Sequence, residues 1–359
     1  MSITTIQGTP SRLTATLRDE ILDLSRQNQI GALNDWFSRR LDDLITAGFF
    51  PSGHDLELVN LRIIRDLSAY RVETRAETVV LGMSGGVDSA LTAALFKKAG
   101  YRVIGVTMPI HQDPVETERG VEACKALDIE HQHIDLSALY DATLVGLAFM
   151  DEHLFDEGAT QDKSVRIRRG NLRARIRMQV LYNLASKNGG FVASTDNLSE
   201  LTAGFWTLHG DVGDVSPIQA LSKSWEVPYL ARINGVPEST VRAKPTDGLG
   251  VDDGDEAQLG CSYLEWDIMF FTISRALHTQ SEIGAPNISL STLRAGLGIT
   301  SGMGMQPHQA DVFDAMTRRM GSSWFKRRNP INVAHVMQDR YQMVDEMDEL
   351  LFVPKSFRR

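Results

Sequence analysis

The sequence VVLGMSGGVDSALTAALF, residues 79–96, decides the fold of this chain. It begins with an apolar run rich in β-branched residues, continues with a polar turn that contains two glycines, and ends with a stretch typical of a helix. A second β-rich run, RVIGVTM, follows at residues 102–108. Strand, helix and strand in this order predict a parallel sheet covered by helices, because parallel strands need a crossover connection.

The polar turn SGGVDS carries the first indication of chemistry. Ligands of parallel sheets bind beyond the carboxyl ends of the strands, where a loop leads into a helix. Gly85 and Gly86 let the main chain approach a ligand closely, and the N–H groups at the helix start favour an anion. Ser84 and Ser89 offer hydroxyls, and Asp88 suits such a site if a divalent cation joins it to phosphate oxygens. The alternative is a plain glycine-rich turn in which Asp88 is only a helix-start acid; a Walker A loop is excluded because the GK[ST] ending is missing.

The composition limits the class of protein. The chain has 359 residues, of which 42% are hydrophobic and 23% are charged, and its net charge is -9. An acidic balance argues against a protein that coats nucleic acid, and no apolar run is long enough to cross a bilayer. The N-terminus lacks the layout of a secretory signal, and the two cysteines, Cys124 and Cys261, form no zinc or disulfide spacing. We therefore expect a cytoplasmic protein with small-molecule partners, no nucleic acid and no membrane.

The remaining elements follow from periodicity and turn residues. Helices are predicted at residues 12–28, 32–48, 55–74, 90–100 and 170–188. Further strands are predicted at residues 129–136 and 189–195. Because the strands are concentrated between residues 78 and 195, we expect one α/β core with helical additions at both ends.

The turn resembles the pyrophosphate-binding loop of the ATP pyrophosphatase enzymes, which cleave ATP between the α and β phosphates and transfer AMP to a substrate oxygen. Residues 170–232 then resemble the core of the NAD synthetase family. The matching pieces are, in order, the helix motif GNLRARIRM, the step STDN, Glu200, GFWT, a GD pair, Pro217 and Lys223. Further on, AKPTDGL and DDGDEAQLGCSYLEWD resemble two more family segments. The resemblance covers roughly residues 55–330, and the order of several motifs makes it specific.

This resemblance implies a Rossmann-like parallel sheet flanked by helices, of the adenine nucleotide alpha hydrolase-like type. It implies a helical N-terminal extension at residues 1–50, an NAD synthetase-like ATP pyrophosphatase domain at residues 51–330, and a C-terminal helical tail at residues 331–359. The implied reaction is the ATP-dependent amidation of deamido-NAD to NAD with ammonia, through an adenylated nicotinate carboxylate, with release of AMP and pyrophosphate. The first 50 residues are too few for a glutaminase domain and contain no cysteine nucleophile, which favours free ammonia as the nitrogen donor; the alternative is ammonia supplied by a separate subunit. A homodimer is expected, as is common in the family.

The resemblance also implies the site residues. Asp88 and Glu200 are expected to hold Mg²⁺, the cofactor. The expected contacts of the co-substrate ATP are Gly82, Ser84, Gly85, Gly86, Asp88, Ser89, Thr195, Lys223 and Thr246. The expected contacts of deamido-NAD are Arg175, Asp211, Asp214 and Lys326. Catalysis is assigned to Asp88, Glu200, Lys223 and Asp211.

These assignments agree with the chemistry. Adenylation brings anionic groups together, so a metal ion and Lys223 are needed to neutralise charge. The second step needs neutral ammonia, and Asp211 is a plausible acceptor for the proton of ammonium.

Two substitutions keep alternatives open. Leu208 stands where ammonia-type members often carry a lysine, and Phe325 where they often carry a histidine. The alternatives are another AMP-forming pyrophosphatase-loop ligase that acts on a different carboxylate, or a non-catalytic nucleotide-binding relative. The arginines at 173, 175 and 177 could equally be a solvated helix face.

Overall fold

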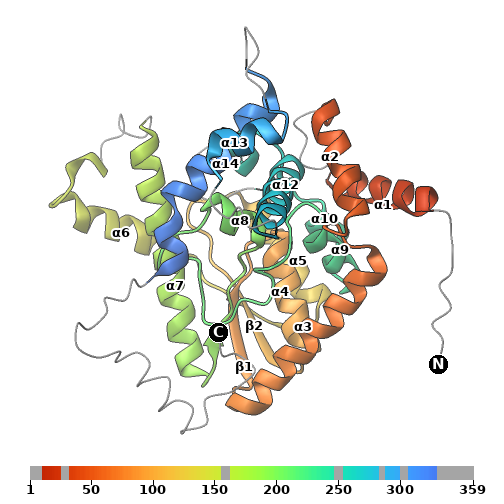
Figure 1. Cartoon of the computed structure of the whole chain (residues 1–359). Helices are drawn as coiled ribbons and strands as arrows, with labels where there is room; N and C mark the ends of the chain where they lie inside the picture. Colours follow the sequence, from red (N-terminus) through yellow and green to blue (C-terminus); the bar gives the residue numbers. More distant parts are fainter. Residues whose placement is uncertain are drawn as a thin grey trace, which may run out of the picture.

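Four parallel strands form one sheet in the order β3-β2-β1-β4 (Figure 1). The computed structural model describes residues 10–25, 32–154, 162–245, 254–282, 288–299 and 306–329. The strands are β1 (Thr78–Gly82), β2 (Arg102–Thr107), β3 (Glu130–His133) and β4 (Phe191–Val192). The predicted parallel sheet is confirmed, although its third and fourth strands are shorter than predicted.

Helices cover both faces of the sheet, and β1 shows why. Val79 and Leu81 point into the larger core, which α3, α4 and α9 help to form, whereas Val80 points into a core shared with α6 and α7. All three side chains are fully buried. A central parallel strand that is buried on both sides needs a continuous apolar run, and TVVL provides it.

The helices on these faces are α3 (Gly53–Thr74), α4 (Val87–Lys98), α5 (Pro114–Ala126), α6 (Ser137–Ala148), α7 (Lys163–Lys187) and α9 (Glu226–Ile233). Three of them, α3, α4 and α7, start earlier than predicted, α3 by only two residues. The first turn of α4 includes Asp88, so the polar loop is shorter than the sequence suggested. Helix α7 begins at Lys163, before the predicted start at residue 170, because the Asp162 side chain caps it by accepting a hydrogen bond from the Ser164 N–H.

The other helices are α1 (Pro10–Ser25), α2 (Asp35–Thr46), α8 (Leu198–Ala203), α10 (Glu238–Val241), α11 (Asp255–Leu259), α12 (Tyr263–Glu282), α13 (Leu290–Gly296) and α14 (His308–Ser322), with short 3-10 turns at Glu152–Leu154 and Trp324–Arg328. Within the described ranges, no helix is both long and apolar enough to cross a membrane.

The N-terminal helices are part of the main core. Helix α2 packs against α12, and its Phe37, Leu41 and Leu44 side chains are buried in the larger core. The helical additions expected at the N-terminal end are therefore present. The proposed tail at residues 331–359 lies outside the described residues, and the division of the chain at residues 50 and 330 stays a prediction.

Candidate active site

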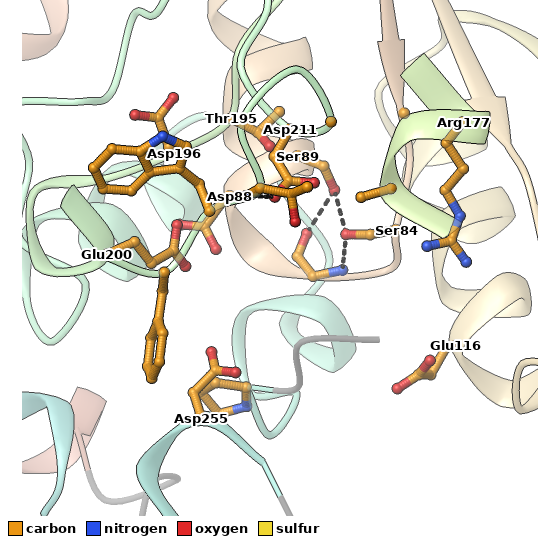
Figure 2. A pocket seen from close by; sticks show the side chains of 18 of the residues that line it. Ser84, Asp88, Ser89, Glu116, Arg177, Thr195, Asp196, Glu200, Asp211 and Asp255 are labelled. Carbon is orange, nitrogen blue, oxygen red and sulfur yellow. Dashed lines mark hydrogen bonds between the residues drawn. The ribbon is translucent and has the colours of Figure 1, made fainter. Parts of the chain in front are cut away.

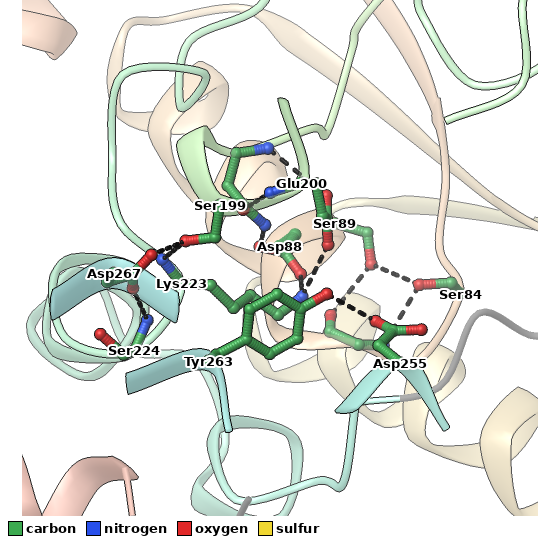
Figure 3. A network of polar contacts seen from close by, with 12 residues as sticks. Ser84, Asp88, Ser89, Ser199, Glu200, Lys223, Ser224, Asp255, Tyr263 and Asp267 are labelled. Carbon is green, nitrogen blue, oxygen red and sulfur yellow. Dashed lines mark hydrogen bonds and ion pairs between the residues drawn. The ribbon is translucent and has the colours of Figure 1, made fainter. Parts of the chain in front are cut away.

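The polar turn between β1 and α4 is closely packed. Gly85 has a φ of +85°, and a Cβ atom there would overlap the main-chain carbonyl oxygen of Glu116 on α5. The Ser84 hydroxyl accepts a hydrogen bond from the Gly86 N–H at 3.2 Å and lies 3.2 Å from the Ser89 hydroxyl. Figures 2 and 3 show this serine pair. Only glycine fits the conformation and the space at position 85, as the sequence predicted.

Next to this turn, one ammonium group lies between two carboxylates. The Nζ atom of Lys223 contacts Asp88 on α4 and lies 3.0 Å from Oε1 of Glu200 on α8 (Figure 3). The other oxygen of Asp88 accepts a hydrogen bond of 2.9 Å from Asn197, which also forms a capping box with Glu200 at the start of α8. Three of the four residues expected to carry the chemistry, Asp88, Glu200 and Lys223, therefore meet at one point. The side chains of Lys223, Asp88 and Glu200 are 8%, 13% and 17% exposed.

Burial and neighbouring charges have opposite effects on the pKa values of Glu200 and Lys223. Burial raises the pKa of the Glu200 carboxyl to about 8, although the charge of Lys223 acts to lower it. Burial also acts to lower the pKa of Lys223, but the carboxylates of Asp88, Glu200 and Asp255 outweigh it and hold this pKa above its ordinary value. Lys223 is therefore a permanent cation in this site.

A further set of buried groups fixes the position of Lys223. The hydroxyl of Tyr263 donates a hydrogen bond of 2.9 Å to Asp255, and the Lys223 Nζ atom lies 5.6 Å from the centre of the Tyr263 ring. The Lys223 main-chain N–H donates to the Ser199 hydroxyl at 2.9 Å, and that hydroxyl donates to Asp267. Figure 3 shows these groups around the lysine. The sequence motifs contained Asp255 and Tyr263, but nothing in their spacing placed them against Lys223.

A cavity of about 510 Å³ opens from this point, within the size range of small-molecule sites. Most of the predicted site residues line it: Gly82, Ser84, Gly86, Asp88, Ser89, Thr195, Glu200, Asp211, Lys223 and Lys326. Five more basic residues line it as well: Arg119, Lys163, Arg177, Lys244 and Arg319. Six acidic residues share the wall with these seven basic ones, a mixture that suits phosphate groups bound together with a cation: Asp88, Glu116, Asp196, Glu200, Asp211 and Asp255.

Asp211 and Lys326 lie in another part of the cavity wall. Asp211 accepts a hydrogen bond of 2.6 Å from the Thr207 N–H. Its side chain is open to the cavity, yet enclosure by neighbouring protein raises the pKa of the carboxyl. Lys326 donates hydrogen bonds to the carbonyl oxygens of Gly204, at 2.8 Å, and of Trp206. The structure thus brings these two predicted residues to the same cavity as the phosphate loop.

Comparison with known proteins agrees with this geometry. The sequence profile of the family described as NAD synthase matches residues 61–296. An NH(3)-dependent NAD(+) synthetase of Methanosarcina mazei is 32% identical over 283 residues, which cover 77% of this chain and 97% of that protein. A protein of the same description from Alkaliphilus oremlandii is 36% identical over 192 residues, which cover 52% of this chain and 74% of that protein.

The chain belongs to the NAD synthase family. The structure of an NMN synthetase from Francisella tularensis is similar with a TM-score of 0.59 and 24% identity, and the match covers 78% of this chain and 99% of that one. An NH3-dependent NAD synthetase from Campylobacter jejuni is similar with a TM-score of 0.54 and 23% identity, covering 77% and 98%. Both similarities confirm the fold predicted from the family resemblance.

Three described residues predicted for this NAD synthase family member, Gly85, Arg175 and Asp214, do not line the cavity. Arg175 is exposed, and its Nε donates to the Leu208 carbonyl oxygen at 3.2 Å. Asp214 accepts hydrogen bonds of 2.9 Å from the Tyr182 hydroxyl and the Val192 N–H. Neither lines the cavity of the described chain. Thr246 lies outside the described residues. Their roles toward substrate stay predictions.

Arg177 on α7 is a cavity residue that the sequence assignment missed (Figure 2). Its Nε donates to the Met108 carbonyl oxygen at 3.0 Å, and burial lowers its pKa to about 10. Residues two apart on a helix do not share a face, so Arg175 and Arg177 cannot both point into the cavity. The helix motif GNLRARIRM contained both, but the sequence did not show which face of α7 meets the sheet.

Proposed function

We propose that this chain is an NH3-dependent NAD synthetase, which converts deamido-NAD, ATP and ammonia into NAD, AMP and pyrophosphate. The observation that carries the proposal is the contact of Lys223 with Asp88 and Glu200 beside the glycine turn. The 32% identity to a synthetase of that description, over 97% of its length, supports it.

Asp88 and Glu200 fit a divalent cation. Both are oxygen donors, and both contact the same Lys223 Nζ atom, so their carboxylates are near enough to share one ion. No cluster of three or more acidic, histidine or cysteine side chains suited to a metal occurs in the part of the chain that the structure describes. From their shared contact with Lys223 we propose that these two residues hold Mg²⁺ together with oxygens of ATP. When bound, the ion would supply positive charge against the phosphates.

The protein groups match the needs of adenylation. A carboxylate oxygen of the nicotinate group attacks the α-phosphorus of ATP, and the bond from that phosphorus to the bridging oxygen breaks as pyrophosphate leaves. The glycine turn and the N–H groups at the start of α4 would receive the pyrophosphate. Lys223, held as a cation, would neutralise charge that develops on the leaving group.

Amidation then requires ammonia and a base. The nitrogen attacks the acyl carbon of the adenylate, the bond from that carbon to the AMP oxygen breaks, and the nitrogen loses a proton. We propose that Asp211 takes a proton from ammonium, since enclosure by protein raises the pKa of its carboxyl and makes the carboxylate a better proton acceptor.

The test is incubation of the pure protein with ATP, Mg²⁺, deamido-NAD and ammonium, followed by separation of the nucleotides. NAD and AMP should form in equal amounts. Release of ADP would refute the mechanism, and turnover of other carboxylates without turnover of deamido-NAD would refute the substrate. Glutamine in place of ammonium should give no product.

We also propose that the protein works in the cytoplasm as a homodimer. Apolar side chains are exposed along α6 and α7, including Leu139, Val145, Ile167 and Tyr182. Just after α6, Phe149 is 93% exposed and Met150 is 87% exposed. A face of this kind is typical of a subunit contact. Sedimentation velocity should show a dimer that Phe149→Glu weakens; a wild-type monomer at micromolar concentration would refute the proposal.

A further inference from the structure

A second cavity of about 850 Å³ lies between α2, α12 and α13, and none of the described residues lines both cavities. Figure 1 shows these helices on one side of the molecule. The indole N–H of Trp36 on α2 donates to the Leu297 carbonyl oxygen, just after α13, at 3.2 Å and so joins two walls of the cavity. The N-terminal helices therefore help to form a site that is separate from the active site.

Two arginines converge in this cavity on one aspartate. Arg40 lies 3.3 Å from the Asp43 carboxylate, and Arg275 of α12 donates to the Asp43 carbonyl oxygen at 3.3 Å. Asp43 is the one acidic residue among the described residues that line the cavity, so the lining keeps a net positive charge. Arg40 is also held in place by the Leu297 carbonyl oxygen, at 3.2 Å, and by the Trp36 ring, 5.4 Å from its guanidinium carbon.

The Arg275 guanidinium has N–H groups that form no hydrogen bond within the described part of the chain. Its side chain is exposed, and the bond to Asp43 is its one hydrogen bond within the described part of the chain. A guanidinium carries five N–H donors in a planar fork, which suits phosphate oxygens. The guanidinium of Arg40 is therefore fixed by several contacts near the Asp43 carboxylate. The guanidinium of Arg275 is held by one hydrogen bond to the Asp43 carbonyl oxygen.

A buried hydroxyl gives an independent sign of a ligand. Thr272 lines the cavity one turn before Arg275 and is 5% exposed. Its Oγ1 atom has no hydrogen-bond partner in the described structure. Leaving a buried hydroxyl unpaired costs about 1–3 kcal/mol, so a polar group of a ligand there would be favourable.

The rest of the wall combines the apolar residues Leu44, Ile288, Leu293 and Leu297 with the hydroxyl residues Thr279, Ser289 and Thr292. We infer that the second cavity binds a nucleotide-sized organic phosphate. Its phosphate lies between Arg40 and Arg275, and its less polar part lies on the leucines. The volume is within the range of such sites. Helix α12 carries Tyr263 at its first position and Arg275 further along, so this site and the active site share one helix.

The test counts AMP sites on the full-length protein by equilibrium dialysis. The wild type should bind two AMP molecules per chain, and Arg275→Gln should bind one, with at least a tenfold loss of affinity at the second site. The matched control is Arg62→Gln, which removes an exposed arginine of α3 that pairs with Asp66; it should bind two. Whether the wild type shows one AMP site or two, an Arg275→Gln variant whose number and affinity of AMP sites are unchanged would overturn the inference.

Hydrogen exchange locates the site without relying on stoichiometry. AMP should protect amides of residues 272–279 and 290–297 in the wild type and in Arg62→Gln, and should not protect them in Arg275→Gln. Inorganic pyrophosphate is the second probe. If it protects these segments and AMP does not, the cavity is a simple anion site and the inferred ligand class is wrong. Neither measurement needs turnover, so the result is separate from the fate of the proposed synthetase activity.

Discussion

Replacing Lys223 by methionine tests the charge arrangement of the active site most directly. Methionine keeps an unbranched side chain of similar length but carries no charge. The ammonium that contacts both Asp88 and Glu200 is then lost, and two carboxylates remain side by side with 13% and 17% exposure. Both carboxyl groups have then lost their shared counter-ion, and they repel each other once the pH is high enough to ionise Glu200.

The size of the effect follows from this burial. Removing one partner of a buried ion pair costs about 3–5 kcal/mol. Because both carboxylates border the cavity and keep some contact with water, we expect the lower end, a loss of about 3 kcal/mol in the free energy of unfolding. AMP formation should fall about 10²–10³-fold, as when one preorganised charge-stabilising group is removed.

The loss of stability should also depend on pH. The pKa of Glu200 is about 8 in the folded protein, against an ordinary value of 4.5, so its contribution to stability is present at low pH and is lost as the pH rises. The charge of Lys223 lowers this pKa. Without it the pKa rises further, and the difference between variant and wild type should be larger at about pH 8.5 than at about pH 5.5.

Urea denaturation at the two pH values, together with an AMP-release assay, measures these effects. The control is Lys98→Met, which removes an exposed lysine from the same helix as Asp88 and should leave both the unfolding midpoint and the activity unchanged. A loss below about 1 kcal/mol, or a difference that shrinks as the pH rises, would show that Lys223 is not the buried counter-ion of this pair.

Three other predictions concern the loop and the core. Asp88→Asn keeps the shape of the side chain but removes its charge, so AMP release should fall about 10²–10³-fold while the circular dichroism spectrum stays the same; unchanged AMP release would remove Asp88 from the mechanism. Gly85→Ala places a side chain at a φ of +85° against a main-chain oxygen and should lower the free energy of unfolding by about 1–3 kcal/mol. Gly146→Ala, at an open position of α6, should raise the free energy of unfolding by about 0.5–1 kcal/mol. Urea denaturation in which both glycine variants were stabilised, or both destabilised, would contradict this reasoning. Cys124 and Cys261 are buried, and burial raises the pKa of the Cys124 thiol to about 12 and that of the Cys261 thiol well above its ordinary value. Iodoacetamide at about pH 8 should therefore modify neither thiol before the protein unfolds. Labelling of the folded protein, detected by mass spectrometry, would argue against this packing.

The sequence predicted the sheet and the glycine turn after β1 because both depend on local patterns. The run TVVL is apolar throughout, as a central parallel strand requires, and the turn needs glycine at position 85 for its left-handed φ. Glu200 and Lys223 were predicted correctly as neighbours of Asp88 because ordered motifs of a known family located them, whereas spacing alone gave no contact.

Other features depend on packing between distant segments. Which arginine of α7 enters the cavity is decided by the face that α7 turns to the sheet, and this selects Arg177 and leaves Arg175 exposed. The hydrogen bond between Tyr263 and Asp255 joins α12 to α11 behind Lys223. The strand predicted at residues 189–195 ends at Val192 because Asp214 binds the Val192 N–H and Val215 pairs with Ala193.

The position of Lys223 between two carboxylates has a consequence for the order of binding. The ammonium is tethered to the site and competes with any metal ion for the same oxygens, at an effective concentration that a free ion in solution does not reach. A triphosphate offers the lysine new anionic partners, so it can release Asp88 and Glu200 at the moment a metal ion arrives. At the Mg²⁺ site proposed above, free Mg²⁺ is therefore expected to bind weakly on its own and more tightly together with ATP.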